Sequence, residues 1–219
     1  MTQAYKGVVF DLDGTLINSL DEISTVTNTV LKEAGLPTHP VDAYKYFAGG
    51  GARILLERAV PAEVAQDPEK FEPIFEKLLV IYEKLSGTIA KPYDGIDEML
   101  SALAERGIRL HVLSNKPHEG TLTCVKELLP KHNFDLIYGA RDGVPKKPHP
   151  QGAIDILEET GIEPEKMLYL GDTAVDMETA CGAKMIPVGV LWGFRKRDEL
   201  EESGAQHIIE TPLDLLNLL

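Results

Sequence analysis

The sequence GVVFDLDGTL, residues 7–16, runs from a short apolar stretch into two aspartates and then into a glycine. Residues 7–10 are few, apolar and β-branched at two positions, which is typical of a strand buried on both faces of a parallel sheet. Because side chains alternate along a strand, Asp11 and Asp13 lean to the same side while Leu12 points into the core. The stretch therefore predicts a buried strand that ends on two carboxylates.

The residues that follow this strand show helical spacing and no strand candidate. Apolar residues recur at helical intervals in the ranges 20–34, 41–47, 52–60 and 69–85. Ser19-Leu20-Asp21-Glu22 has the form of a capping box at the start of the first helix. We therefore expect an all-helical domain over 17–87, inserted directly after the first strand.

From residue 88 onward, strand and helix patterns alternate. Strands are predicted over 108–113, 136–138, 167–170 and 185–190, and helices over 96–106, 117–129, 151–160 and 175–183. Such alternation predicts right-handed βαβ units and a parallel sheet with helices on both faces. The expected fold class is α/β, a doubly wound, Rossmann-like parallel sheet built from residues 1–16 and 88–219, with the helical insertion as a cap.

Polar side chains follow several of the predicted strands. Ser114 and Asn115 come after the second predicted strand, and Asp172 and Asp176 come after the "MLYL" strand. Lys147 lies in a loop that precedes a helix. In open α/β sheets, ligands bind beyond the carboxyl ends of the strands. We therefore expect these side chains to converge with the two aspartates of the first strand.

Three carboxylates in one small volume, those of Asp11, Asp13 and Asp172, raise one another's pKa values unless a cation compensates them. A hard divalent cation with oxygen ligands does this, and Mg²⁺ is typically held by one or two carboxylates, waters and substrate phosphate. With Ser114 and Lys147 opposite, the site suits a phosphoryl group, because donors and cations surround its oxygens while one carboxylate attacks phosphorus. The sequence therefore predicts a Mg²⁺ site for phosphoryl transfer.

The sequence resembles the haloacid dehalogenase-like hydrolase superfamily in four motifs, which occur in the family's order and cover essentially the whole chain. They are Asp11-Leu12-Asp13-Gly14-Thr15, Ser114-Asn115-Lys116, Lys147-Pro148-His149-Pro150 and Gly171-Asp172-Thr173-Ala174-Val175-Asp176. The helical insertion resembles the superfamily's small cap domain. The form "SNKP" and the cap loop Ala48-Gly49-Gly50-Gly51 resemble the phosphoglycolate phosphatase-like subgroup.

The resemblance implies a role for each matching acid. Asp11 would be the nucleophile that forms an aspartyl-phosphate, and Asp13 would protonate the leaving oxygen and then take a proton from water. Asp11, the backbone carbonyl of Asp13, and Asp172 would ligate Mg²⁺. Asp176 would support the metal ligands from behind, although an acid in the first turn of a helix is the alternative interpretation.

The resemblance also implies the groups that bind substrate. Ser114 and Lys147 would grip the phosphoryl oxygens, with backbone amides near Gly14 and Asn115 assisting. Lys146 is kept as the alternative to its neighbour.

The substrate contacts of the cap are left open. The loop around Gly50 either presents amides to the substrate or is a simple turn between two helices. Arg53 either pairs with a substrate carboxylate or lies at the surface.

Composition limits the partners of the chain. It has 219 residues, 22 of them lysine or arginine and 35 aspartate or glutamate, for a net charge of −13 at pH 7. No basic stripe for a nucleic acid is visible. The two cysteines lie in no metal or redox spacing, and no run approaches the ~18 apolar residues of a membrane span. We expect a cytoplasmic protein, a monomer or homodimer, that binds neither nucleic acid nor membrane.

Together these features predict a Mg²⁺-dependent phosphatase for a small phosphorylated metabolite, with phosphoglycolate as the first substrate to try. A sugar phosphomutase resembling β-phosphoglucomutase, or a pyrophosphatase, is the alternative on the same scaffold. A phosphate-binding regulatory protein is the alternative outside enzymes, and the intact pair Asp11 and Asp13 disfavours it.

Overall fold

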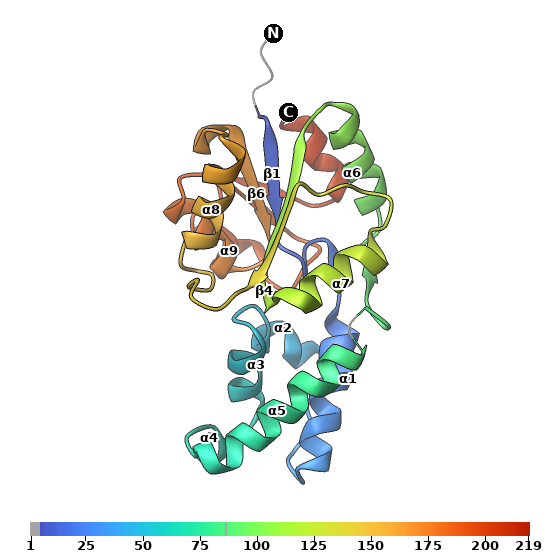
Figure 1. Cartoon of the computed structure of the whole chain (residues 1–219), viewed down its shortest axis with the longest axis vertical. Coiled ribbons are helices and arrows are strands. Elements are labelled where there is room, and N and C mark those ends of the chain that lie inside the picture. Colours follow the sequence, from blue (N-terminus) through green and yellow to red (C-terminus); the bar gives the residue numbers. More distant parts are fainter. Residues whose placement is uncertain (1–4, 86) are drawn as a thin grey trace.

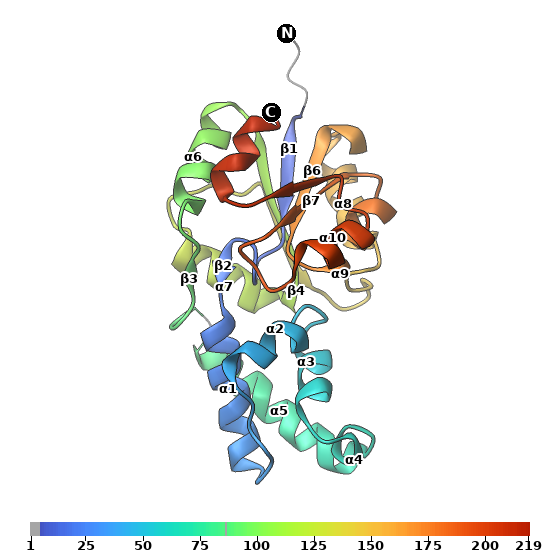
Figure 2. The ribbon, with the colours of Figure 1, turned by 180° about the vertical axis from the view of Figure 1, so that it is seen from behind.

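The computed structural model describes residues 5–85 and 87–219 and has a six-stranded parallel sheet at its centre (Figure 1). Its strands are β1 (Gly7–Phe10), β4 (Arg109–Pro117), β5 (Leu136–Ala140), β6 (Met167–Gly171), β7 (Ile186–Val190) and β8 (His207–Ile209). They lie in the order β5-β4-β1-β6-β7-β8 (Figure 2). The chain thus starts in the middle of the sheet and builds outward in both directions, which is the doubly wound topology predicted from the sequence.

Strand β1 is buried because it has a parallel neighbour on each side and helices on both faces. Gly7 is opposite Arg109 of β4 and opposite Met167 of β6. Val8 and Phe10 belong to one hydrophobic cluster, and Val9 belongs to a second one across the sheet. The continuous apolar run is therefore what a strand with two covered faces requires.

Helices cover both faces of this sheet. They are α6 (Ile96–Glu105), α7 (His118–Leu128), α8 (Gln151–Thr160), α9 (Ala174–Gly182) and α10 (Arg197–Glu202), with 3₁₀ turns η2 (Pro164–Lys166) and η3 (Pro212–Asn217). Helices α6 and α7 share a hydrophobic cluster with η3, whereas α8 and α9 share the other cluster. The two clusters place these helices on opposite faces of the sheet.

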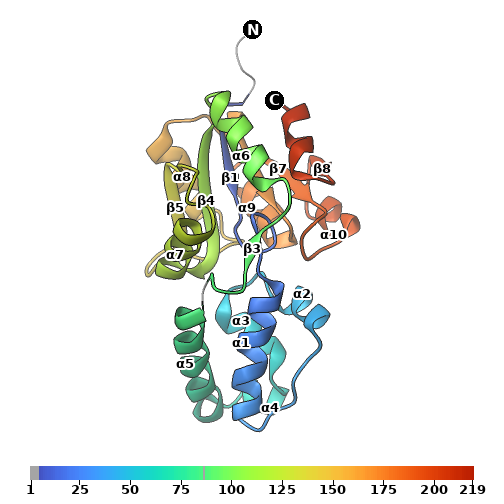
Figure 3. The same ribbon diagram turned by 90° about the vertical axis from the view of Figure 1, so that its right-hand side faces the viewer.

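A second group of helices lies beyond the carboxyl ends of the strands (Figure 3). It comprises α1 (Leu20–Glu33), η1 (Val41–Ala43), α2 (Tyr44–Phe47), α3 (Ala52–Ala59), α4 (Ala62–Ala65) and α5 (Pro68–Leu85). These helices bury an apolar cluster of their own, which includes Val30, Leu56 and Leu78. The elements agree with the predicted helical insertion, and its limits at 17 and 87 as a separate domain stay a prediction.

A short ribbon connects the two groups and corrects the expectation that no strand follows the first one before residue 88. Strand β2 (Ile17–Asn18) pairs antiparallel with β3 (Lys91–Pro92). The two segments that connect the insertion to the sheet therefore satisfy each other's backbone hydrogen-bonding groups. Two residues are too few to show a strand period in a sequence.

The capping box predicted at the start of α1 is wrong. Ser19 occupies the N-cap position without a side-chain hydrogen bond to the helix. Glu22 is fully buried, and its Oε2 accepts hydrogen bonds from the amides of Gly87 at 3.0 Å, Ile89 at 3.3 Å and Ala90 at 3.3 Å. The Glu22 carboxylate thus binds the segment that leads from the insertion back to the sheet, and it is not available to cap the amino terminus of α1.

Among the described residues, no helix combines the length and the apolar character that crossing a bilayer would require.

Candidate active site

Asp11 and Asp172 lie side by side because they follow neighbouring parallel strands. Phe10 of β1 is opposite Leu170 of β6, and the Asp11 amide donates to the Leu170 carbonyl at 2.9 Å. Carboxylate oxygens of Asp11, Asp172 and Asp176 lie within 4.8 Å of one another, and all three residues are buried. The structure therefore brings together the acids that the sequence placed at one edge of the sheet.

Asp172 is held in place by two donors and by two glycines. Its Oδ2 accepts a hydrogen bond from the Phe194 amide at 2.8 Å, and its Oδ1 accepts one from the Thr15 hydroxyl at 3.3 Å. A Cβ on Gly14 or on Gly193 would collide with the Asp172 carboxylate. Gly14 also has a φ of +93°, which favours glycine. Its amide donates to the Ile17 carbonyl at 2.9 Å, so the contribution of Gly14 here is the close approach it permits.

Lys147 is the lysine that reaches the acids. Its Nζ donates to Asp11 Oδ1 at 2.8 Å, to Asp176 Oδ1 at 2.6 Å and to the Leu113 carbonyl at 3.0 Å. The three hydrogens of the ammonium group are thereby used. Of the two adjacent lysines, the one that begins the Lys-Pro motif is therefore the one in contact with the acids.

Asp176 is an acid in the first turn of a helix, as the alternative interpretation expected, and its support of metal ligands stays a prediction. Its Oδ2 accepts from the amide of Thr173 at 3.1 Å and from the Thr173 hydroxyl at 2.8 Å, which completes a capping box at the start of α9. Its Oδ1 accepts from Lys147. The residue is thus a helix cap and also a partner of the buried lysine.

Ser114 and Asn115 lie on β4 itself, beyond the predicted end of that strand and in a stretch of irregular pairing. The Ser114 Oγ accepts a hydrogen bond from the Lys116 amide at 3.2 Å, so its own hydroxyl hydrogen can be donated. The Asn115 side chain donates to the carbonyls of Lys147 at 2.9 Å and Gly49 at 3.0 Å, and it accepts from the Lys147 amide at 2.9 Å. Asn115 therefore joins the lysine loop to the helical insertion.

Burial and crowding raise the pKa values of the acids. Burial, and then the charge of Asp176, raise the pKa of Asp11 to about 7, although Lys147 opposes the shift. Burial, and then the charges of Asp176 and Asp11, raise the pKa of Asp172 well above its usual value. The positive charges around these carboxylates thus do not balance their negative charges.

The donor set fits a hard divalent cation. The carboxylates of Asp11, Asp13, Asp172 and Asp176 lie near the ammonium groups of Lys116 and Lys147, and the positive charge of Arg195 also acts on Asp172. Among these residues the acids outnumber the cations, and carboxylate oxygens are available as metal ligands. Hard cations such as Mg²⁺ take such ligands.

The glycine loop of the insertion faces the site, but through Gly49 and Gly51. Both line the cavity described below, whereas Gly50 is not among its lining residues. A Cβ on Gly50 would instead meet the side chain of Ile54 in the next helix at 2.9 Å. Of the three glycines, Gly49 and Gly51 therefore line the cavity, and the expected role of Gly50 at this surface is not supported.

Arg53 is engaged within the helical insertion. Its guanidinium makes two hydrogen bonds of 2.9 Å to Glu72 and lies 4.3 Å from the ring centre of Phe75. This arrangement favours the surface alternative over a substrate contact.

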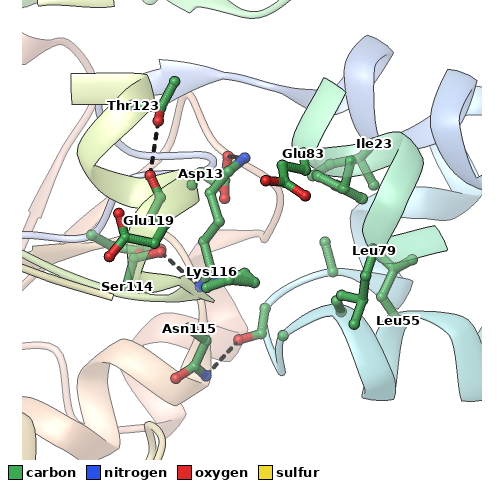
Figure 4. Close-up of a pocket in the computed structure, with 18 residues that line it drawn as sticks. Asp13, Ile23, Leu55, Leu79, Glu83, Ser114, Asn115, Lys116, Glu119 and Thr123 are labelled. Atoms are coloured by element: carbon green, nitrogen blue, oxygen red, sulfur yellow. Dashed lines mark hydrogen bonds and ion pairs between the residues drawn. The ribbon is translucent and has the colours of Figure 1, made fainter. Parts of the chain in front are cut away.

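A cavity of about 510 Å³ separates the edge of the sheet from the helical insertion (Figure 4). Asp11, Asp13 and Ser114 line it on the sheet side. On the opposite side Figure 4 shows apolar side chains of the insertion, among them Ile23, Leu55 and Leu79. Asp11 and Asp13 thus open onto a space of the size of a small-molecule site, whereas Asp172 and Asp176 are not among its lining residues.

Lys116 also lines this cavity, a position for which the sequence predicted no role. Its side chain is 4% exposed, and its Nζ lies 3.6 Å from Asp13 Oδ1 and 3.9 Å from Glu22 Oε1. Burial alone would lower the pKa of Lys116, but the charge of Asp13 first and that of Glu22 among others raise it. The signal in the sequence was a lysine within a buried strand end, where lysine is rarely found unpaired.

Comparison with known proteins identifies the family. Residues 8–190 match the model of the family described as haloacid dehalogenase-like hydrolase. The chain belongs to this family. The match includes β1 and β6, the two strands that the acids follow, as well as β4 and the helical insertion. It confirms the resemblance drawn from the four motifs and the prediction of a hydrolase.

Individual relatives are similar in sequence over nearly their whole length. The phosphoglycolate phosphatase of Aquifex aeolicus is 35% identical over 213 residues, which cover 97% of this chain and 95% of that protein. The N-acetylmuramic acid 6-phosphate phosphatase of Pseudomonas aeruginosa is 28% identical over 98% of this chain and 94% of its own. The crystal structure of a predicted phosphoglycolate phosphatase from Haemophilus somnus superimposes with a TM-score of 0.91 and 27% identity, covering 100% of this chain and 99% of that one. These relatives support the prediction of a phosphoric monoester hydrolase.

Proposed function

We propose that this hydrolase is a Mg²⁺-dependent phosphatase that removes the phosphoryl group of a small phosphomonoester, with phosphoglycolate as the first candidate. The observation that carries the proposal is the position of Asp11, whose carboxylate opens onto the cavity and is bound by Lys147 at 2.8 Å. The relatives named above as phosphoglycolate phosphatases supply the candidate substrate.

In the first half of the reaction, Asp11 is the nucleophile. A carboxylate oxygen of Asp11 bonds to phosphorus while the bond from phosphorus to the leaving oxygen breaks, and Asp13 gives its proton to that oxygen. Asp13 suits this task because it lines the same cavity and lies two residues along the chain from the nucleophile. The products are the free alcohol and an aspartyl-phosphate at Asp11.

In the second half, Asp13 acts as the base. It takes a proton from a water molecule whose oxygen attacks phosphorus, and the bond between phosphorus and Asp11 breaks. Inorganic phosphate leaves, and both carboxyl groups return to their initial states.

The remaining residues stabilise charge. Lys147 places a positive charge against Asp11, and the Ser114 hydroxyl has a hydrogen to donate to a phosphoryl oxygen. Asp11, the carbonyl of Asp13, and Asp172 would hold Mg²⁺. The bound cation would supply positive charge that offsets the negative charge of the phosphoryl oxygens.

Phosphate release tests this proposal. The purified protein is incubated with Mg²⁺ and phosphoglycolate, p-nitrophenyl phosphate, pyrophosphate or a sugar phosphate, and both free phosphate and isomerised sugar phosphate are measured. We expect release from phosphomonoesters, and loss of that release with EDTA. Isomerised sugar phosphate without release would favour the mutase, and release from pyrophosphate alone would favour the pyrophosphatase. No release from any compound would favour the phosphate-binding regulatory protein.

A further inference from the structure

Lys116 is a buried cation without a hydrogen-bond acceptor. Among the described residues its Nζ donates no hydrogen bond, and the two nearest carboxylates, at 3.6 Å and 3.9 Å, lie beyond ordinary hydrogen-bond length. Leaving three ammonium hydrogens unsatisfied in a buried position is costly. Such a group is an exception that calls for a partner.

The surroundings hold the Lys116 ammonium in the cavity. The aliphatic part of the side chain runs close to Gly120, where a Cβ would lie 3.6 Å from Cε. On the side of the insertion, the ring centre of Tyr82 is 5.1 Å from Nζ, and Ile23 and Leu55 line the cavity together with the acid Glu83. Figure 4 shows the side chain extending from β4 toward Asp13.

The position of the Lys116 Nζ places it near the leaving group of the substrate and not near the phosphoryl group. Lys147 already serves Asp11 and Asp176, whereas Lys116 lies beside Asp13, the residue that gives its proton to the leaving oxygen. A group bonded to the carbon that carries the leaving oxygen would therefore come within reach of Lys116. An anionic oxygen is what an unsatisfied ammonium binds most strongly.

Resting on the phosphatase activity proposed above, we infer that Lys116 selects substrates that carry a carboxylate next to the phosphate ester. The substrate class is then the phosphate esters of short hydroxy acids. The carboxylate would accept the hydrogen bonds that Lys116 now lacks. Neutral alkyl and sugar phosphates leave the ammonium unsatisfied and are disfavoured.

Two substrates of matched size test the inference. Phosphoglycolate carries the carboxylate, and ethyl phosphate carries a methyl group in its place. We expect the wild-type protein to prefer phosphoglycolate, and Lys116→Met to reduce the ratio of the two kcat/KM values by roughly 10- to 100-fold, as for loss of a charge-assisted hydrogen bond. Lys116→Arg keeps the charge and should retain part of the preference. Lys126→Met, at an exposed position of α7, is the control and should keep the wild-type ratio.

A binding measurement gives a second readout. Glycolate should inhibit hydrolysis of p-nitrophenyl phosphate by the wild-type protein, and at least tenfold more weakly in Lys116→Met. Equal losses on both substrates would mean that Lys116 acts through Asp13 or through folding, which overturns the inference. A wild-type protein that hydrolyses both esters equally well would also overturn it, and would leave the phosphatase activity standing. Absence of all hydrolysis would instead defeat the proposed function.

Discussion

The sheet edge behind the cavity and the lining of the cavity itself differ in how their polar groups are satisfied. On the sheet side, Lys147 has three acceptors, and Asp172 and Asp176 have two and three donors. In the cavity the helical side is mainly apolar, and Lys116, which lines the cavity from β4, has no hydrogen-bond acceptor among the described residues. The acids at the sheet edge are thus held by several hydrogen bonds, whereas the cavity keeps the unsatisfied ammonium group of Lys116 for a ligand.

The largest effect should come from the nucleophile on the sheet side. Asp11→Asn is expected to lower kcat on p-nitrophenyl phosphate by about 10⁴-fold or more, because no aspartyl-phosphate can form. Phosphate release under saturating Mg²⁺ measures it. Asp142→Asn, which removes an exposed acid from a loop, is the matched control. Activity within tenfold of wild type would exclude Asp11 as the nucleophile.

Replacing each of the two buried lysines should lower the stability of the protein by a different amount, because their hydrogen-bond partners differ. Lys147→Met leaves Asp11 and Asp176 without their shared cation, and we expect it to lower the free energy of unfolding by about 3–5 kcal/mol. Lys116→Met breaks no hydrogen bond and should cost no more than about 2 kcal/mol. Urea unfolding of the two variants without metal measures both values. Equal losses of unfolding free energy would remove the distinction between the two lysines.

His111 on β4 should change the stability of the fold with pH in the direction opposite to that of the acids. It is fully buried, neither ring nitrogen has a hydrogen-bond partner within residues 5–85 and 87–219, and burial lowers its pKa to about 4. Between pH 6.5 and 4 the unfolded chain takes up a proton at this residue and the folded protein does not, so acidification destabilises the fold by about 3 kcal/mol. Raised carboxylate pKa values act with the opposite sign, because there the folded state holds the extra proton.

His111→Leu isolates the histidine contribution. The difference in unfolding free energy between this variant and the wild type should grow as pH falls from 6.5 to 4, in favour of the variant. A difference that is constant with pH would show that His111 titrates normally.

Metal binding should be coupled to protons at the sheet edge. Because the pKa of Asp11 is raised to about 7, this carboxyl holds a proton at pH 6 that a cation must displace. Calorimetric titration with Mg²⁺ at pH 6, in two buffers of different ionisation enthalpy, should show release of close to one proton or more. At pH 8.5 the release should be smaller, and in Asp11→Asn the contribution of Asp11 disappears. Equal proton release at both pH values would contradict the shift.

The smallest effect is expected within the helical insertion. Arg53 and Glu72 form an ion pair in which both side chains are more than a third exposed. Arg53→Met should cost less than about 1 kcal/mol and leave the KM for phosphoglycolate within about twofold of wild type. A large rise in KM would restore the substrate-binding alternative for this arginine.

Much of the sheet edge could be predicted because it depends on local patterns. The run before Asp11 predicts a strand covered on both faces, and alternation of strands and helices predicts parallel neighbours for it. Parallel strands end at a common edge, so Asp172 could be placed beside Asp11 without a structure. The helical spacing over 17–87 predicted the insertion for the same reason.

What could not be predicted depends on partners distant in the chain. The pattern at Ser19 indicated a capping box, but Glu22 is claimed by amides at positions 87, 89 and 90, where tertiary hydrogen bonds prevail over a local motif. The isolation of Lys116 arises from residues on α1 and α5, such as Tyr82, which no local spacing reveals. The same holds for Gly50, whose neighbours face the cavity in its place.

Asn115 links the sheet side of the molecule to the loop of the insertion. One of its hydrogen bonds reaches Gly49 in the loop of the insertion, and Arg195 reaches the neighbouring Ala48 carbonyl at 3.1 Å. Its other bonds stay within the sheet side, at Lys147. Moving the helices outward to let inorganic phosphate depart would break these contacts and separate Phe194 from Ile23 and Leu55. The hydrogen bonds of Asp172 and Asp176 lie within the sheet side and would stay.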